Sequence, residues 1–224
     1  MRSSRALRAQ ISRSALEANA IALAGPEAVA DLRRDAYGHG VAIVAAALNA
    51  AGVHRAVVDE RDADTLRRIG LTPAEGAATL DPRDLFGLPG AGGEPVMRLV
   101  GSVLSLKLLR AGEGVSYNYT HVAAQDTRIA LVSGGYGQGV VRAIGNHADV
   151  EIAGVRHPIV GRVAMDVCVV DVGHAPVQVD DDVVYFGGAG AAAGALAEWE
   201  RASGLRGAEI VCSLGLHVAR EEAA

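Results

Sequence analysis

Apolar residues follow two different periods along this chain of 224 residues. In the first third they recur at helical spacing: Leu16, Ile21 and Leu23 follow a capping Ser12, which predicts a helix over residues 12–23. Strands that alternate with helices of this length favour βα units and a parallel sheet. Further elements expected here are helices over 41–51 and 63–69, the second ending at Gly70, and a strand over 55–58.

The pattern changes after Gly70. Residues 71–95 are rich in proline and glycine and predict a linker or hinge. From Val96 onward, short apolar runs separated by glycine-rich turns favour a β barrel or sandwich, with a helix over 191–202. A tight turn at 153–154 predicts a hairpin. The expected strands cover 128–132, 150–152, 160–172, 183–186 and 210–214. The chain therefore divides into a βα segment, residues 1–95, and a β-domain, residues 96–224.

Composition narrows the function classes. Half of the residues are hydrophobic, which excludes disorder as the main state, and the net charge of −5 disfavours a nucleic-acid binder. No apolar run reaches the ~20 residues of a membrane span, and the basic start lacks a secretory apolar segment. We therefore expect a cytoplasmic protein without membrane partners, with Cys168 and Cys212 reduced. The 21 basic residues include one lysine, Lys107.

Familiar chemical motifs are missing from the sequence. The histidines and cysteines show none of the spacings of a metal site, so no metal is expected. The glycine-rich segment 187–194 lacks the Gly-Lys-Ser/Thr of a P-loop and is interpreted as a turn before a helix. Single tyrosines in glycine-rich strings are more often packed or capping residues than catalysts.

Five strings taken together, in this order, resemble the alanine racemase family. Residues 35–40, Asp-Ala-Tyr-Gly-His-Gly, match the end of its motif Lys-Ala-Asp/Asn-Ala-Tyr-Gly-His-Gly. Residues 115–117 and 135–139 are similar to its tyrosine string and its Gly-Tyr-Ala-Asp-Gly. Residues 158–166, Pro-Ile-Val-Gly-Arg-Val-Ala-Met-Asp, are close to its Pro-Ile-Val-Gly-Arg-x-x-Met-Asp, and 208–220 resemble its closing segment.

The resemblance implies a fold, a cofactor and a set of site residues. The family joins a (β/α)8 barrel that holds pyridoxal 5'-phosphate to a C-terminal β-domain, and it interconverts L- and D-alanine for the bacterial cell wall. A lysine Schiff base and a tyrosine of the partner subunit act as the two bases, so a homodimer is implied. Tyr117 stands at the tyrosine position, Tyr136 and Met165 at substrate contacts, and Tyr37 at a cofactor-phosphate contact.

Three departures from the family pattern predict lost or impaired activity. The catalytic lysine position holds Arg33, whose guanidinium stays protonated and cannot form an imine. About 95 residues precede the β-domain, whereas a barrel takes about 250, so the expected fold is a partial (β/α) barrel fragment followed by the β-domain. The final tyrosine of the family is Glu222. The alternatives are an impaired racemase, a non-catalytic remnant that dimerises or binds a partner, and a gene fragment.

Overall fold

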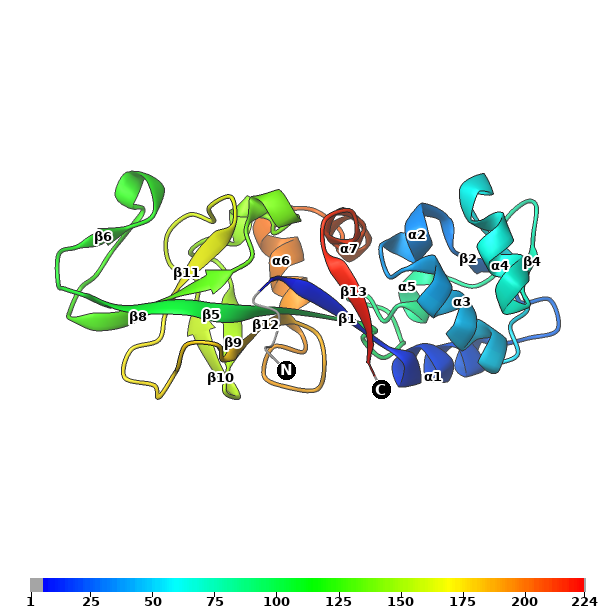
Figure 1. The fold of residues 1–224 in the computed structure, drawn as a ribbon, viewed down its shortest axis with the longest axis horizontal. Helices are drawn as coiled ribbons and strands as arrows, with labels where there is room; N and C mark the ends of the chain where they lie inside the picture. The colour runs from blue at the N-terminus through cyan, green and yellow to red at the C-terminus, as the bar shows by residue number, and fades with distance from the viewer. Residues whose placement is uncertain (1–5, 224) are drawn as a thin grey trace. The chain divides into compact units, whose positions relative to one another are not determined.

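The computed structural model describes residues 6–223 and divides into two compact units (Figure 1). Residues 6–8 and 99–207 form the β unit, and residues 9–98 and 208–223 form the βα unit. Each unit therefore combines segments from distant parts of the sequence. No described helix is long and apolar enough to cross a membrane.

Helices of the βα unit confirm the helical spacing seen in the sequence. Helix α1 covers Arg13–Leu23, and the Oγ of Ser12 caps it by accepting the N–H of Ala15. The predicted helix over 41–51 is α3, Val41–Ala50, whose buried face includes Val44 and Leu48. Helix α4, Ala63–Ile69, ends at Gly70 in the left-handed conformation with φ 99°, as a C-terminal glycine does.

A short parallel sheet lies beside these helices. Its strands are β2, Ala30–Asp31; β3, Arg55–Val57; and β4, Thr72–Pro73, in the order β2-β3-β4. Strand β2 pairs with β3, and β3 with β4, in parallel, whereas a closed (β/α)8 barrel has eight parallel strands. The expectation of a partial barrel fragment is therefore confirmed.

The proline-rich segment packs into the βα unit instead of forming a free linker. Leu80, Leu85, Phe86 and Leu88 are buried, and helix α5 covers Pro82–Leu85. The expectation of a hinge missed the apolar residues placed between the prolines. Each of them reaches the core while proline fixes the turns between them.

The end of the chain is helical where the sequence predicted a strand. Helix α7 covers Gly207–Gly215, so the strand over 210–214 is wrong. Ile210, Val211 and Leu214 are buried because i, i+1 and i+4 share one face of a helix. The last strand is β13, Ala219–Ala223, which lies next to β1, Arg8–Ser12, in the sheet order.

The β unit contains an antiparallel sheet with the pairing order β10-β9-β12-β5, extended through β5 to β8 and β11. The predicted hairpin is confirmed, because β9 and β10 meet at Ala153 and Gly154, with φ 52° and 80°. Trp199 on α6 is buried with its ring edge-on to Tyr185 and Phe186. The elements are β5, Met97–Leu109; β8, Thr127–Ser133; β9, Asp149–Ile152; β10, Val155–Pro158; β11, Val167–Asp171; β12, Asp182–Phe186; and α6, Ala195–Ser203.

Small elements complete the two units. The pair β6, Gly114–Val115, and β7, His121–Val122, forms a separate two-stranded antiparallel ladder. The remaining short helices are α2, Arg33–Tyr37; η1, Glu60–Asp62; η2, Tyr117–Tyr119; η3, Tyr136–Gln138; and η4, Arg142–Ile144.

Candidate functional site

Arg33 is held by a carboxylate at the end of strand β2. Its Nε and Nη2 donate to the two oxygens of Asp31 at 2.9 and 2.6 Å, and its backbone N–H donates to Oδ1 at 3.1 Å. The Asp31 side chain is 6% exposed, against 55% for Arg33. Burial acts to raise the pKa of Asp31, but the hydrogen bonds and charge of Arg33 outweigh it, and the pKa is lowered. Asp31 is therefore an anion with a bidentate partner.

This pairing keeps the Arg33 side chain cationic. The hydrogen bonds to Asp31 raise the pKa of Arg33, so its guanidinium offers no lone pair to an electrophile. The only lysine of the chain, Lys107, lies exposed on β5 in register with Ile129. The βα unit therefore contains no lysine amine.

Tyr37 converges on the same carboxylate. Its phenol donates to Asp31 Oδ2 at 3.3 Å, and its ring lies 5.6 Å from that of Phe86. Burial and the negative charge of Asp31 raise the pKa of Tyr37, which keeps the phenol neutral. The structure thus brings Arg33 and Tyr37 together around Asp31, a residue that the sequence pattern did not single out.

The backbone between β2 and α3 is a left-handed turn. Arg34, Asp35, Ala36 and Tyr37 have φ between 53° and 57°, a region that costs roughly 1–2 kcal/mol for each residue with a Cβ. Gly38 follows with φ 80°, and a Cβ there would lie 2.5 Å from the carbonyl oxygen of Val211. Non-glycine residues in the left-handed conformation persist where the surrounding structure holds them there, and such residues concentrate at functional sites.

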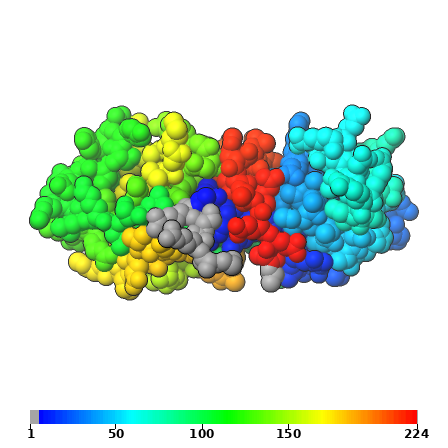
Figure 2. Space-filling model, in the orientation of Figure 1, coloured from blue at the N-terminus to red at the C-terminus, as the bar shows by residue number. Residues whose placement is uncertain are grey.

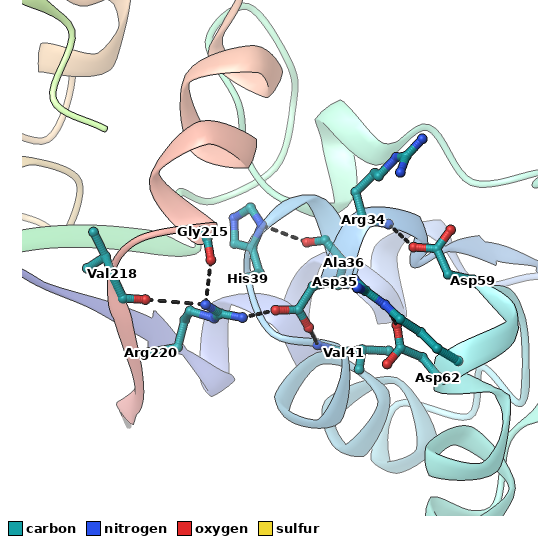
Figure 3. Close-up of polar contacts among 11 residues, drawn as sticks. Arg34, Asp35, Ala36, His39, Val41, Asp59, Asp62, Gly215, Val218 and Arg220 are labelled. Carbon is teal, nitrogen blue, oxygen red and sulfur yellow. Dashed lines mark hydrogen bonds and ion pairs between the residues drawn. The ribbon is translucent and has the colours of Figure 1, made fainter. Parts of the chain in front are cut away.

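Polar contacts from other segments hold this turn (Figure 3). Asp35 Oδ1 accepts the N–H of Val41 at 2.7 Å, and the same carboxylate pairs with Arg220 of β13. Asp59 Oδ2 accepts the backbone N–H of Arg34 at 2.8 Å. The guanidinium of Arg34 projects away from Asp35 (Figure 3). The motif in the family has alanine at this position.

Tyr117 lies on the β unit beside another strained residue. Ser116 has φ 61°, and its Oγ donates to the carbonyl of Arg162 at 2.5 Å, which ties the tyrosine string to the Pro-Ile-Val-Gly-Arg string. A Cβ at Gly161 would lie 2.7 Å from the Cβ of Ser116, so only glycine allows this approach. The Tyr117 side chain is 58% exposed.

Tyr136 and Met165 lie together on the β unit. The N–H of Tyr136 donates to Ala164 O at 2.9 Å, and the N–H of Gly137 donates to Met165 O at 2.8 Å. A Cβ at Gly135 would lie 2.3 Å from Met165 O, which explains the glycine. Their side chains are 39% and 54% exposed. The structure therefore groups Tyr136 with Met165, while Arg33 and Tyr37 belong to the βα unit.

Glu222 is bound in an ion pair. Its Oε1 accepts from Arg13 Nη1 at 3.3 Å, and Arg13 also donates to Glu17 at 2.7 Å. Both side chains are about half exposed, so the pair contributes little to stability. The carboxylate at this position is engaged by a cation of the chain itself.

Comparisons with known proteins identify relatives of this chain. The model of the alanine racemase C-terminal domain matches residues 96–222. The alanine racemase of Mycobacterium leprae is 39% identical over 128 residues, which cover 56% of this chain and 33% of that protein. The enzyme of Thermobifida fusca is 39% identical over 145 residues, which cover 65% of this chain and 39% of that protein.

A solved structure extends the likeness of fold. The alanine racemase from Streptomyces coelicolor A3(2) aligns with a TM-score of 0.81 and 19% identity, over 98% of this chain and 98% of that chain. At this identity the likeness is one of fold. The matched parts of this chain span about a third to two fifths of the length of the curated relatives.

Proposed function

The chain belongs to the alanine racemase family, and we propose that it is a non-catalytic member, which neither binds pyridoxal 5'-phosphate covalently nor racemises alanine. The family depends on this cofactor. The observation that carries the proposal is the bidentate pair of Arg33 with Asp31, with hydrogen bonds of 2.9 and 2.6 Å.

The residues present do not fit covalent attachment of the cofactor. An imine forms only from an amine with a free lone pair, and the guanidinium of Arg33 has none. Asp31 accepts from Nε and Nη2 of that guanidinium, so these two nitrogens and the carboxylate already bind each other. No catalytic step through the cofactor is therefore derived for this chain.

The parallel sheet supports the same proposal. Barrel enzymes take their ligand-binding groups from the carboxyl ends of eight strands and the loops that follow. The βα unit offers the ends of β2, β3 and β4. Groups that the family places on the other strands have no counterpart within residues 6–223, so a cofactor would lack most of its surroundings.

Spectroscopy after separation from free cofactor tests the proposal. The purified chain is mixed with pyridoxal 5'-phosphate, passed through a desalting column and scanned for the visible absorption of a lysine-bound pyridoxal group. We expect no retained absorption, and no D-alanine formed from L-alanine. Retained absorption together with D-alanine formation would falsify the proposal.

Two variants make this experiment specific. Lys107→Arg removes the only lysine, so absorption that survives in the unmodified chain but disappears here reports incidental attachment at β5. Arg83→Lys places a lysine on the surface of the βα unit and measures how much absorption any added lysine produces. Absorption that persists in Lys107→Arg, a variant without any lysine, would contradict our interpretation of Arg33.

We also propose that the chain forms a homodimer through the β unit and acts in the cytoplasm. Tyr117 and Tyr119 are exposed at 58% and 69%, and Val122 lies close by in sequence with 54% exposed. Three exposed apolar side chains within six residues are typical of an association surface. By resemblance Tyr117, with Tyr136 and Met165, would face a partner subunit. The free thiols of the described cysteines suit a reducing compartment.

Sedimentation equilibrium tests the dimer. Tyr119→Ser is expected to weaken association about tenfold or more, because an aromatic anchor contributes more than 1 kcal/mol at an interface. Val155→Ser is the matched control, since Val155 is 55% exposed at the start of β10 in the same unit. A monomer at all concentrations, or equal loss in both variants, would remove the support for this surface.

A further inference from the structure

A pocket of about 600 Å³ lies on the βα unit between the left-handed turn and helix α7. This volume falls within the range of small-molecule sites. Its walls come from three segments far apart in the sequence: the turn, η1 and the end of the chain. Tyr37 and Glu222, the positions that the resemblance assigns to a cofactor phosphate, do not line it.

Three arginines and one aspartate supply the charge of the pocket. The lining includes Arg34, Arg61 and Arg220 together with Asp35. Arg220 is already engaged, because it pairs with Asp35 and donates to the carbonyl of Gly215 at 2.5 Å. That pair neutralises Asp35, the one carboxylate on the wall. The charges of Arg34 and Arg61 therefore remain to attract an anionic ligand.

The guanidinium of Arg34 is available for a ligand. Its backbone N–H is bound by Asp59, but within residues 6–223 its side chain makes no hydrogen bond or ion pair. The left-handed turn directs this side chain away from Asp35 and Arg220 (Figure 3). The strained backbone thus presents a cation on the surface of the unit.

Arg61 supplies a second cation. Its Nε lies 3.4 Å from Asp62 Oδ2, and its side chain is 72% exposed. No hydrogen bond with a described residue engages its two terminal nitrogens, which can therefore donate to a ligand. Asp59 and Asp62 flank the two cations, but each already accepts a hydrogen bond from Arg34 or Arg61. Ser213 on α7 adds a hydroxyl to the opposite wall.

We propose that this pocket binds a phosphomonoester of a small molecule through Arg34 and Arg61. Two guanidinium forks match the two negative charges and several acceptor oxygens of a phosphomonoester. The volume exceeds that of a phosphate ion, which leaves space for the organic part against Leu216 and Cys212. Arginine is required at position 34 for this site, whereas the motif of the family has alanine there.

Isothermal titration calorimetry at matched ionic strength tests the proposal. Inorganic phosphate and glycerol 3-phosphate are titrated into the full chain, with sodium chloride as the control for nonspecific charge effects. We expect saturable binding with a Kd below about 1 mM, tighter for glycerol 3-phosphate. Binding that does not saturate, or that is equally tight for both probes, overturns the assignment to an organic phosphate.

Substitutions locate the binding. Arg34→Ala restores the residue of the family motif and is expected to weaken glycerol 3-phosphate binding about tenfold, and Arg61→Ala a few-fold. Arg83→Ala removes an equal charge from an exposed position of the same unit and is expected to leave the Kd within a factor of two or so. Equal weakening by Arg83→Ala, or none by Arg34→Ala in a folded variant, overturns the proposal. Circular dichroism confirms that each variant is folded.

Discussion

His39 predicts a specific acid sensitivity of the βα unit. The ring is fully buried and stacks on Phe86, with centroids 4.2 Å apart and planes 11° from parallel. Its Nδ1 lies 3.0 Å from Ala36 O, which can only accept, so Nδ1 carries the proton. Nε2 is buried and has no hydrogen-bond partner among residues 6–223. A second proton would place both a charge and an unpaired donor in the core.

The size of this acid sensitivity follows from the pKa of His39. Burial lowers the pKa of His39 from 6.5 to about 4. Between these values the unfolded chain binds a proton that the folded chain does not, so stability is present above pH 6.5 and is lost as the pH falls. Each pH unit corresponds to about 1.4 kcal/mol, and the whole interval to about 3 kcal/mol of lost free energy of unfolding.

Urea unfolding followed by circular dichroism measures this loss, because α1, α3 and α4 place much of the helix in the βα unit. The experiment compares the unmodified chain with His39→Phe, which keeps a ring against Phe86 but does not titrate. The unmodified chain should lose about 3 kcal/mol more than the variant between about pH 7 and pH 4. His217→Gln, which removes an exposed imidazole of the same unit, is the control. Parallel pH profiles for the unmodified chain and His39→Phe would refute the reasoning.

Substitutions at three further positions test the fold, each by the urea midpoint. Gly38→Ala should destabilise the chain by about 2 kcal/mol or more, because the new Cβ lies 2.5 Å from Val211 O at a φ of 80°; an unchanged midpoint would mean that the turn relaxes. Ser12→Ala should cost about 1 kcal/mol by removing the cap of α1, and Ser12→Asp should recover it. Trp199→Ala should cost about 3–5 kcal/mol in the β unit, and a loss below about 1 kcal/mol would contradict its place in the core.

Local signals in the sequence predicted the elements that depend on local chemistry. The end of α4 at Gly70 and the hairpin at Ala153 and Gly154 follow from the φ values that glycine and turn residues adopt. Helix α7 was missed because Ile210-Val211-Cys212 is a short apolar run, which is equally typical of a buried strand. Only packing distinguishes the two states.

In the candidate site, too, the sequence predicts some residues, whereas others depend on tertiary packing. The assignment of Arg33 to the lysine position is predicted from resemblance to a family motif, because a motif fixes the spacing of residues in the sequence. Asp31 could not be predicted in this way, because an aspartate at the end of a short strand carries no sequence signal of a functional role. It becomes part of the site because Arg33 and Tyr37 donate hydrogen bonds to it. The pocket beside Arg34 also depends on tertiary structure, because α7 and β13 come from the far end of the chain.

Asp31 changes what a single reversion at position 33 achieves. The buried Asp31 carboxylate owes its lowered pKa mainly to the hydrogen bonds and charge of Arg33, and a lysine at position 33 would again place a cation beside it. An opposite charge within hydrogen-bond distance stabilises the protonated form of an amine, and only the deprotonated amine attacks a carbonyl. Arg33→Lys therefore supplies an amine nitrogen, but in the protonated form that does not attack a carbonyl. If the covalent anchor is lost as we propose, the loss resides in the pair of Asp31 with residue 33, and not in residue 33 alone.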